Sequence, residues 1–335
     1  MTNVSDWLAL TPEEAVEPDL PIIDPHHHLW DRPNTTYLLD GLLDDTSGHN
    51  VRQTVFIECS WAYREDGPEE MRVLGETEAV EQIADASVQQ IGRGPAVARG
   101  IVGSADLLLG AEIAPVLEAH IGASPQRFRG IRHRAAWDGS EDVMGPRARP
   151  PDDLMVDPRF HAGVAELAKH DMTFEAWFFH PQIAQMEELA KACPETTMIV
   201  NHLAGPLGIG PYASGREELF AQWKQGITAL AQYPNLLMKV GGIQMPLNGF
   251  GWHERERPPS SDDLLAENRE WYLHAIEQFG PDRCMFESNF PVDRASCSYT
   301  VVWNQFKKLS AGFSESERAA MLHDTAARAY RLSEV

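Results

Sequence analysis

The sequence predicts a single-domain α/β protein folded as a (β/α)8 (TIM) barrel with long loops on one face. Eight short runs rich in β-branched or aromatic residues follow one another along the chain, and amphipathic helical stretches separate most of them. The length of 335 residues suits one such barrel, and no Gly/Ser-rich or Pro-rich low-complexity linker divides the chain. We therefore expect one domain over residues 1–335.

The order of strands and helices predicts that the barrel is closed. Strands are expected at Pro21–Asp24, Gln53–Ile57, Val97–Val102, Phe128–Arg132, Thr173–Phe178, Thr197–Asn201, Asn235–Val240 and Cys284–Glu287. Helices, recognised by apolar residues at three- and four-residue spacing, are expected at Glu69–Ile91, Pro158–His170, Pro181–Cys193, Glu217–Tyr233, Glu267–Phe279 and about Glu315–Leu332. This alternation predicts parallel strands that close into a barrel rather than an open sheet.

Three segments lie outside the alternation. Residues 1–19 form an N-terminal extension, and residues 135–157 and 245–263 are loop insertions that each follow a strand end. In a barrel, these strand ends lie on the catalytic face. The two insertions are expected to be lids or substrate loops, with a tolerated surface insertion as the alternative.

The chain is strongly acidic, since 28 Lys and Arg residues against 50 Asp and Glu residues give a formal net charge of −22. Without a broad positive field, neither nucleic acid nor an anionic membrane surface is an expected partner. A small-molecule substrate is fully compatible with this balance. The sequence does not determine the oligomeric state, and a homo-oligomer is compatible with it.

Other compositional features favour a cytoplasmic protein. The four cysteines are far apart and form no C-x-x-C pair, so reduced thiols are expected. The acidic N-terminal segment lacks the positively charged start and the apolar core of a signal peptide. No apolar run approaches ~20 residues, so no transmembrane helix is expected.

The strongest chemical motif is the run from Asp24 to Trp30, D-P-H-H-H-L-W, which follows the first strand. Alternate residues of a strand point to the same side, so His26 and His28 are expected to project together while His27 points away. Two imidazoles that converge at a strand end can bind a divalent metal or hydrogen-bond a substrate carbonyl.

Further landmarks occur at successive strand ends. They are IDPHHHLWD, FIECSW, RGIRH, FFHPQ, NHLAGP, MKVGG, FESNFPVD and HDTAARAYRL. In this order they resemble the amidohydrolase superfamily, and more closely its amidohydrolase-2 branch, over about Ile22 to Leu332. That branch includes sugar-lactone hydrolases and 2-pyrone-4,6-dicarboxylate lactonase. The resemblance implies a TIM-barrel hydrolase.

The resemblance also implies roles for the histidines. His26 and His28 match the first-strand pair, while His180 and His202 match the histidines after the fifth and sixth strands. Each also follows a strand closely enough to face the catalytic mouth. Together they are candidate ligands for a divalent metal, zinc first, although some lactonases of the branch work without one. No organic cofactor is expected.

The eighth strand departs from the family pattern. Where the family usually has an aspartate that acts as metal ligand or general base, this chain has Asn289, and an amide cannot take a proton from water near neutral pH. Asp293 or Glu287 is then expected to replace it. Asp293 is favoured because it lies past the strand, towards the mouth, whereas Glu287 is a candidate to orient a histidine. The expected catalytic set is Asp293, His180 and Asn289.

The expected substrate-binding residues follow three strands. Arg132 and Arg134 share a side if the fourth strand continues, so both are placed to grip a carboxylate in bidentate fashion. Aromatic residues near strand ends favour a partly aromatic pocket, and Trp30, Trp61 and Tyr63 are its candidates. Lys239 lies within the seventh strand, and the sequence does not indicate whether it points inward or outward.

These residues lead to three functional hypotheses. The first is hydrolysis of a lactone, a cyclic ester, on a small and sometimes carboxylated substrate. The alternative is a metal-dependent, non-oxidative decarboxylase of an aromatic acid, which the resemblance also allows but which typically keeps the eighth-strand aspartate. The third is a non-catalytic binding protein with a decayed site, which the retention of four histidines disfavours.

Overall fold

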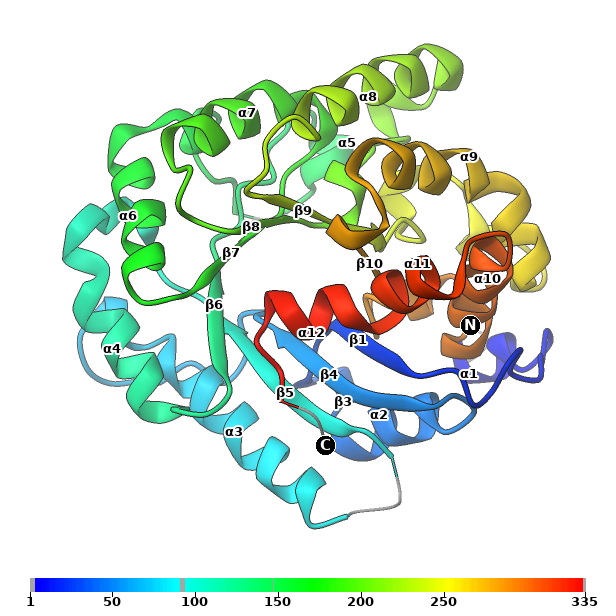
Figure 1. The fold of residues 1–335 in the computed structure, drawn as a ribbon, viewed down its shortest axis with the longest axis horizontal. Helices are drawn as coiled ribbons and strands as arrows, with labels where there is room; N and C mark the ends of the chain where they lie inside the picture. Colours follow the sequence, from blue (N-terminus) through cyan, green and yellow to red (C-terminus); the bar gives the residue numbers. More distant parts are fainter. Residues whose placement is uncertain (1–3, 91–93, 147, 334–335) are drawn as a thin grey trace.

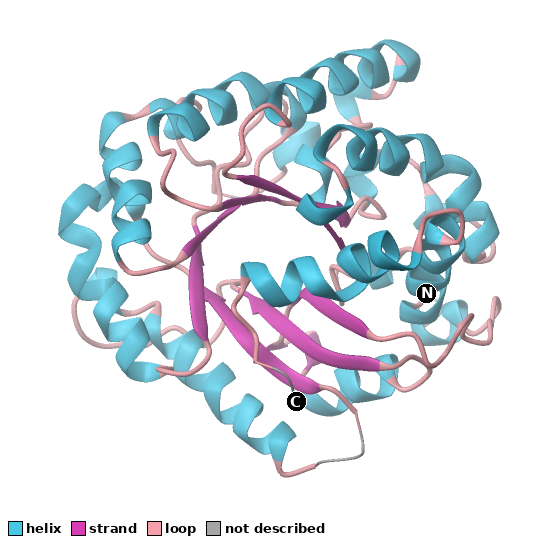
Figure 2. Cartoon of the chain, viewed as in Figure 1, coloured by secondary structure: helices cyan, strands magenta, loops and turns pink. Residues whose placement is uncertain are grey.

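The computed structural model describes residues 4–90, 94–146 and 148–333, and it confirms the predicted barrel (Figures 1 and 2). Its main sheet contains eight parallel strands in the order β1-β4-β5-β6-β7-β8-β9-β10. Their bounds are β1 Ile22–His27, β4 Val51–Ile57, β5 Ala96–Gly103, β6 Phe128–Arg132, β7 Thr173–Ala176, β8 Met198–Val200, β9 Leu236–Gly241 and β10 Cys284–Glu287. A short antiparallel pair, β2 Trp30–Arg32 and β3 Thr35–Tyr37, follows β1.

The barrel closes where β10 meets β1. Just beyond the end of β10, the backbone N–H of Asn289 donates to the carbonyl of His26 in β1 over 3.0 Å. The N–H of His28 likewise donates to the carbonyl of Phe290 over 2.7 Å. The seam therefore places the histidine motif beside the segment that contains Asn289.

Helices surround the strands (Figure 2). They are α1 Val4–Leu8, α2 Leu39–Thr46, α3 Leu74–Val88, α4 Ala114–Ala123, α5 Glu141–Met144, α6 Pro158–Lys169, α7 Ile183–Ala192, α8 Arg216–Leu230, α9 Ser261–Phe279, α10 Tyr299–Ser310, α11 Glu315–Ala319 and α12 Thr325–Ala329. None of the helices in the described ranges is both long and apolar enough to cross a membrane.

Several boundaries differ from the sequence prediction. The first strand continues to His27, so the histidine motif begins inside β1. Helix α9 begins at Ser261, inside the insertion 245–263, because Ser260 and Asp263 form a capping box there. The helix expected over Glu69–Ile91 is split into a 3-10 turn and α3, and Ile91 lies outside the described residues. Helices α1, α2, α4, α5 and α10 were not predicted.

The N-terminal extension packs against α9 and α10. Glu13 accepts hydrogen bonds from the backbone and hydroxyl of Ser261, each over 2.7 Å, and from Asn304 over 2.8 Å. Residue 147, in the insertion 135–157, lies outside the described residues, as do residues 1–3 of the extension. Within the described part, that insertion holds α5.

The N-terminal end of the barrel is closed by the C-terminal segment. Figure 1 shows α12 lying across this opening. Tyr330 is fully buried in an apolar cluster with Ile23, Val55 and Met285. Its hydroxyl donates to Glu175 in the barrel interior. The interior of the barrel is therefore filled by a plug of side chains at this end.

We predict that Tyr330→Phe lowers the free energy of unfolding by about 1–3 kcal/mol, because a buried carboxylate oxygen loses its donor. Urea unfolding followed by circular dichroism measures the change. Tyr233→Phe is the matched control, since the Tyr233 hydroxyl makes no hydrogen bond with the described residues. Equal losses for the two variants would contradict the role given to the Tyr330 hydroxyl.

Candidate active site

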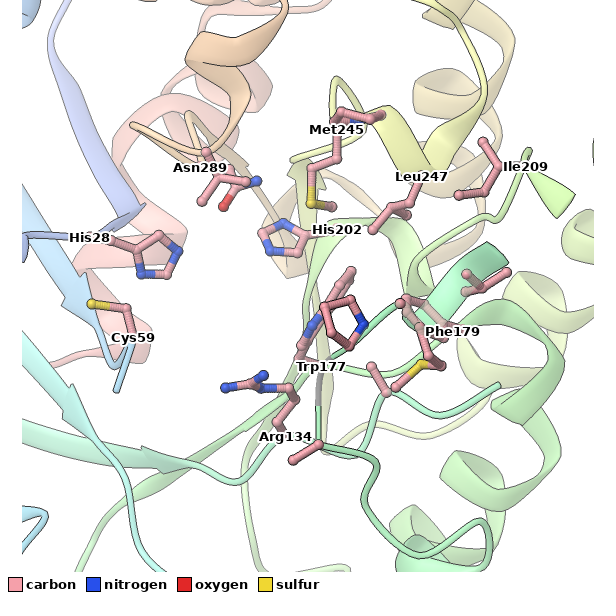
Figure 3. A pocket seen from close by; sticks show the side chains of 18 of the residues that line it. His28, Cys59, Arg134, Trp177, Phe179, His202, Ile209, Met245, Leu247 and Asn289 are labelled. Atoms are coloured by element: carbon pink, nitrogen blue, oxygen red, sulfur yellow. The ribbon is translucent and has the colours of Figure 1, made fainter. Parts of the chain in front are cut away.

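A cavity of about 490 Å³ opens at the C-terminal ends of the strands. Its lining includes His28, His202 and Asn289, which follow β1, β8 and β10. It also includes Arg134 and Trp177, which follow β6 and β7 (Figure 3). The cavity thus lies where parallel strands of a barrel deliver their side chains to a common mouth.

Three of the four candidate histidines meet at the floor of this cavity. The ring of His26 lies 5.0 Å from that of His28 and 4.5 Å from that of His202, measured between centroids. All three rings are buried. Burial holds the pKa of each well below its usual value, the charge of Arg132 lowers all three further, and the charge of Lys239 lowers those of His26 and His202. The three imidazoles are therefore neutral at physiological pH.

Glu287, the last residue of β10, lies against two of these imidazoles and hydrogen-bonds one of them. His202 Nδ1 donates to Glu287 Oε1 over 2.7 Å, and the backbone N–H of His202 reaches the same oxygen over 3.2 Å. His26 Nδ1 lies 2.7 Å from the other oxygen, Oε2. Burial raises the pKa of Glu287 to about 8, while the charge of Lys239 opposes this rise. Since Nδ1 of His202 carries the proton, its Nε2 is left as an acceptor.

His28 has the same tautomer for a different reason. Its Nδ1 donates to the backbone carbonyl of Ile57, at the end of β4, over 2.8 Å. A neutral imidazole with a proton on Nδ1 offers a lone pair on Nε2. His27 points elsewhere, since its Nε2 bonds to Thr54 over 2.8 Å and its ring packs on Phe56.

The backbone at two of the strand ends is strained. His202 and Asn289 have φ values of 52° and 54°, in the left-handed region that non-glycine residues seldom adopt. Gly242, which follows β9, has a φ of 65°, and a Cβ built on it would lie 1.9 Å from His202 Nδ1. Glycine at this position therefore makes room for the His202 ring. Trp177 packs edge-on against that ring, 4.7 Å between centroids.

Asn289 lines the cavity, whereas Asp293 lies buried behind it. Asn289 Nδ2 donates to Asp293 Oδ1 over 2.8 Å, and the backbone N–H of Gln244 reaches Asp293 Oδ2 over 3.3 Å. Burial raises the pKa of Asp293 well above its usual value. Because Asp293 accepts from the amide nitrogen, the amide oxygen of Asn289 is left facing the space beside His28 and His202 (Figure 3).

The two arginines after β6 differ in their surroundings. Arg132 is buried and paired with Glu58, its Nε lying 2.8 Å from Glu58 Oε1, and its Nη1 lies 3.5 Å from His26 Nε2. Arg134 is exposed, lines the cavity, and makes no ion pair with any described residue. Arg134 is thus a cation available to an anionic group, and the exposed Arg32, which hydrogen-bonds the Cys59 carbonyl, also lines the cavity.

The structure places His180, Trp61 and Tyr63 apart from the three histidines, whereas the ring of Trp30 stacks on His28 with 6.2 Å between centroids. His180 packs its ring on Tyr212, and its Nδ1 accepts from the N–H of Leu207 over 3.2 Å. Trp30 lines the cavity. Trp61 packs against the hydrophobic core, and Tyr63 is hydrogen-bonded to Ser60 and Ser104, so neither lies among the lining residues.

Sequence reasoning did not find the polar layer beneath the histidines. Lys239 points inward and is fully buried, with its Nζ 2.8 Å from Glu175 Oε2 and 3.3 Å from His26 Nδ1. Asn201 donates to the same Glu175 oxygen over 2.5 Å. A signal was present, because a charged residue inside an otherwise apolar parallel strand needs a partner within the barrel.

The site also contains a donor set that suits a divalent metal. Ligand atoms of His26, His202 and Glu287 lie within 4.8 Å of one another. Although Glu287 Oε2 is close to His26, the contact lacks the direction of a hydrogen bond, and Oε2 makes none with the described residues. Imidazole nitrogens beside a buried carboxylate oxygen without a donor match the ligands that zinc prefers. These residues therefore fit such an ion.

Comparison with known proteins identifies the family. A family model described as amidohydrolase matches residues 23–332, so the chain belongs to the amidohydrolase family. An uncharacterised protein of Sinorhizobium fredii, y4mH, is 30% identical over 94% of this chain and 99% of its own length. The L-fucono-1,5-lactonase of Burkholderia multivorans is 27% identical over 62% of this chain and 64% of its own.

A solved structure agrees on the fold. The crystal structure of an amidohydrolase from Burkholderia multivorans with bound zinc matches with a TM-score of 0.71 at 22% identity, covering 94% of this chain and all of the other. Family membership places this protein among the hydrolases, as the sequence predicted.

We predict that Gly242→Ala displaces the His202 ring by roughly 1 Å or more, because the added Cβ would otherwise overlap Nδ1. A crystal structure of the variant measures the displacement. Gly122→Ala is the control, since a Cβ there meets nothing within 4 Å. If His202 kept its hydrogen bond to Glu287 in Gly242→Ala, the tight fit between glycine and imidazole would be refuted.

Proposed function

We propose that this protein hydrolyses a lactone, and that the neutral histidine cluster over Glu287 performs the reaction. The main support is the juxtaposition of His28 and His202 at the floor of a cavity, each held with its Nε2 free. The similarity to the L-fucono-1,5-lactonase of Burkholderia multivorans and to the L-rhamnono-gamma-lactonase of Scheffersomyces stipitis also supports it.

His28 is the residue we assign to accept the proton of the attacking water. Its Nδ1 is committed to the carbonyl of Ile57, so Nε2 is the basic atom on the cavity side. The amide oxygen of Asn289 accepts a hydrogen bond from the same water and orients it, while the base is the imidazole. In this proposal Asp293 is a positioning residue, because it fixes the direction of the Asn289 amide.

Two further groups act on the substrate. Arg134, exposed and without an ion-pair partner among the described residues, binds a carboxylate where the substrate carries one. His26, His202 and Glu287 would hold a divalent metal, zinc first, as is typical of amidohydrolases. Such an ion would supply Lewis acidity to the lactone carbonyl. Arg132 remains paired with Glu58 and stabilises the floor of the cavity.

The test is hydrolysis of a lactone panel by the purified full-length chain, followed as acid release with and without added zinc. We predict turnover of at least one lactone, and a fall in kcat/KM of about 10²-fold or more for His28→Ala, because a general base is removed. His253→Ala, which removes an exposed histidine, is the control. Absence of turnover on every lactone, under both conditions, would reject the proposal.

Metal analysis of the same preparations tests the proposed metal site independently of turnover. Zinc retained by the His253→Ala control and lost from His202→Ala is the expected result. Equal zinc in the two variants would place the metal elsewhere. Carbon dioxide release from hydroxybenzoates, without any lactone hydrolysis, would instead favour the decarboxylase hypothesis.

A further inference from the structure

The cavity wall is divided into a polar side and an apolar side. Figure 3 shows His28 and Arg134 on one side, with Asn289 and His202 bordering the open space. Beyond His202, on the side away from His28, lie side chains that offer no hydrogen bond, among them Phe179, Ile209, Met245 and Leu247. Most of the apolar lining is therefore gathered on that side, although Trp30 stacks on His28 itself.

The apolar side has its own small core. Val143 of α5, Phe179 and Met245 belong to a hydrophobic cluster that is separate from the main core of the barrel. These residues come from three loops on the catalytic face that are far apart in the sequence. Asp142, beside Val143, also lines the cavity but is exposed. The loops thus build one continuous apolar surface next to the histidines.

This surface has consequences for the substrate. A hydroxyl group placed against it would lose its hydrogen bonds to water and find no replacement, which disfavours binding. Each CH₂ buried there would instead make binding more favourable. A lactone ring whose carbonyl faces His28 and His202 would direct a ring substituent towards Met245 and Ile209 (Figure 3). The charged and polar groups on the opposite side are left for the ring ester and a carboxylate.

From this division we infer that the natural substrate is a lactone bearing an apolar alkyl or aryl substituent, rather than a polyhydroxylated sugar lactone. The inference rests on the proposed lactonase function and extends it to a substrate class. The carbonyl binds on the histidine side, and the substituent packs on the surface formed by Phe179, Ile209, Met245 and Leu247.

The experiment compares three lactones with the same six-membered ring: δ-valerolactone, δ-nonalactone and glucono-δ-lactone. We expect kcat/KM for δ-nonalactone to exceed that for δ-valerolactone by about tenfold or more, with glucono-δ-lactone the poorest of the three. In Met245→Gln and Ile209→Thr, the ratio between δ-nonalactone and δ-valerolactone is expected to fall towards one. The matched controls Met71→Gln and Ile121→Thr, both half-buried and outside the cavity lining, keep the ratio of the unaltered protein.

A binding measurement distinguishes failure of this inference from failure of the proposed function. Calorimetric titration uses δ-valerolactam and its 6-butyl derivative, which resist hydrolysis. It measures how much the apolar surface contributes to binding, even if no lactone is turned over. A tenfold or greater gain in affinity from the butyl group supports the inference. Equal affinity of the two lactams, or a preference for glucono-δ-lactone over δ-nonalactone, would overturn it.

Discussion

One buried carboxylate, that of Glu287, sets the arrangement of the polar centre. It ends β10, the strand that closes the barrel against β1, and from there it reaches imidazoles supplied by β1 and by the segment after β8. By accepting from His202 Nδ1, it decides which nitrogen of that ring faces the cavity. The proposed chemistry depends on this orientation, because a ring nitrogen must be unprotonated to bind a metal ion, and in His202 that nitrogen is Nε2.

Burial works against ionisation of this carboxyl group, and the charge of Lys239 opposes that effect. Two cations lie beside the histidines, and each has its own partner, Arg132 with Glu58 and Lys239 with Glu175. Buried ion pairs of this kind contribute little net stability, but removing one partner is strongly destabilising, so they fix geometry. Together with the plug formed by Tyr330, they fill the barrel beneath the floor of the cavity.

Much of the fold was predictable from the sequence, because strand and helix alternation is a local signal. All eight strands were located, and the order of the histidine motifs indicated the family. The structure of the loop insertions was harder to predict. The capping box that starts α9 lies inside the insertion 245–263, whose Pro and Ser content predicted a loop. Helix α10 was missed although it is largely buried, since it begins with β-branched residues that favour strands.

The site was predictable in part. His26 and His28 converge as the alternation of a strand requires. The sequence could not show that Arg132 is paired with Glu58, that Asp293 lies behind Asn289, or that His180 packs on Tyr212, because these are contacts between residues distant in the chain. For the same reason, the division of the cavity into polar and apolar sides emerged only from the positions of the loops.

The protonation state of His202 tests the central role of Glu287 most directly. Nitrogen-15 spectra of the protein labelled at histidine, with the His202 signals assigned by their loss in His202→Ala, report the proton on each ring nitrogen. The account predicts a neutral ring at pH 7 with its proton on Nδ1 and none on Nε2. A ring protonated on Nε2, or on both nitrogens, would contradict it.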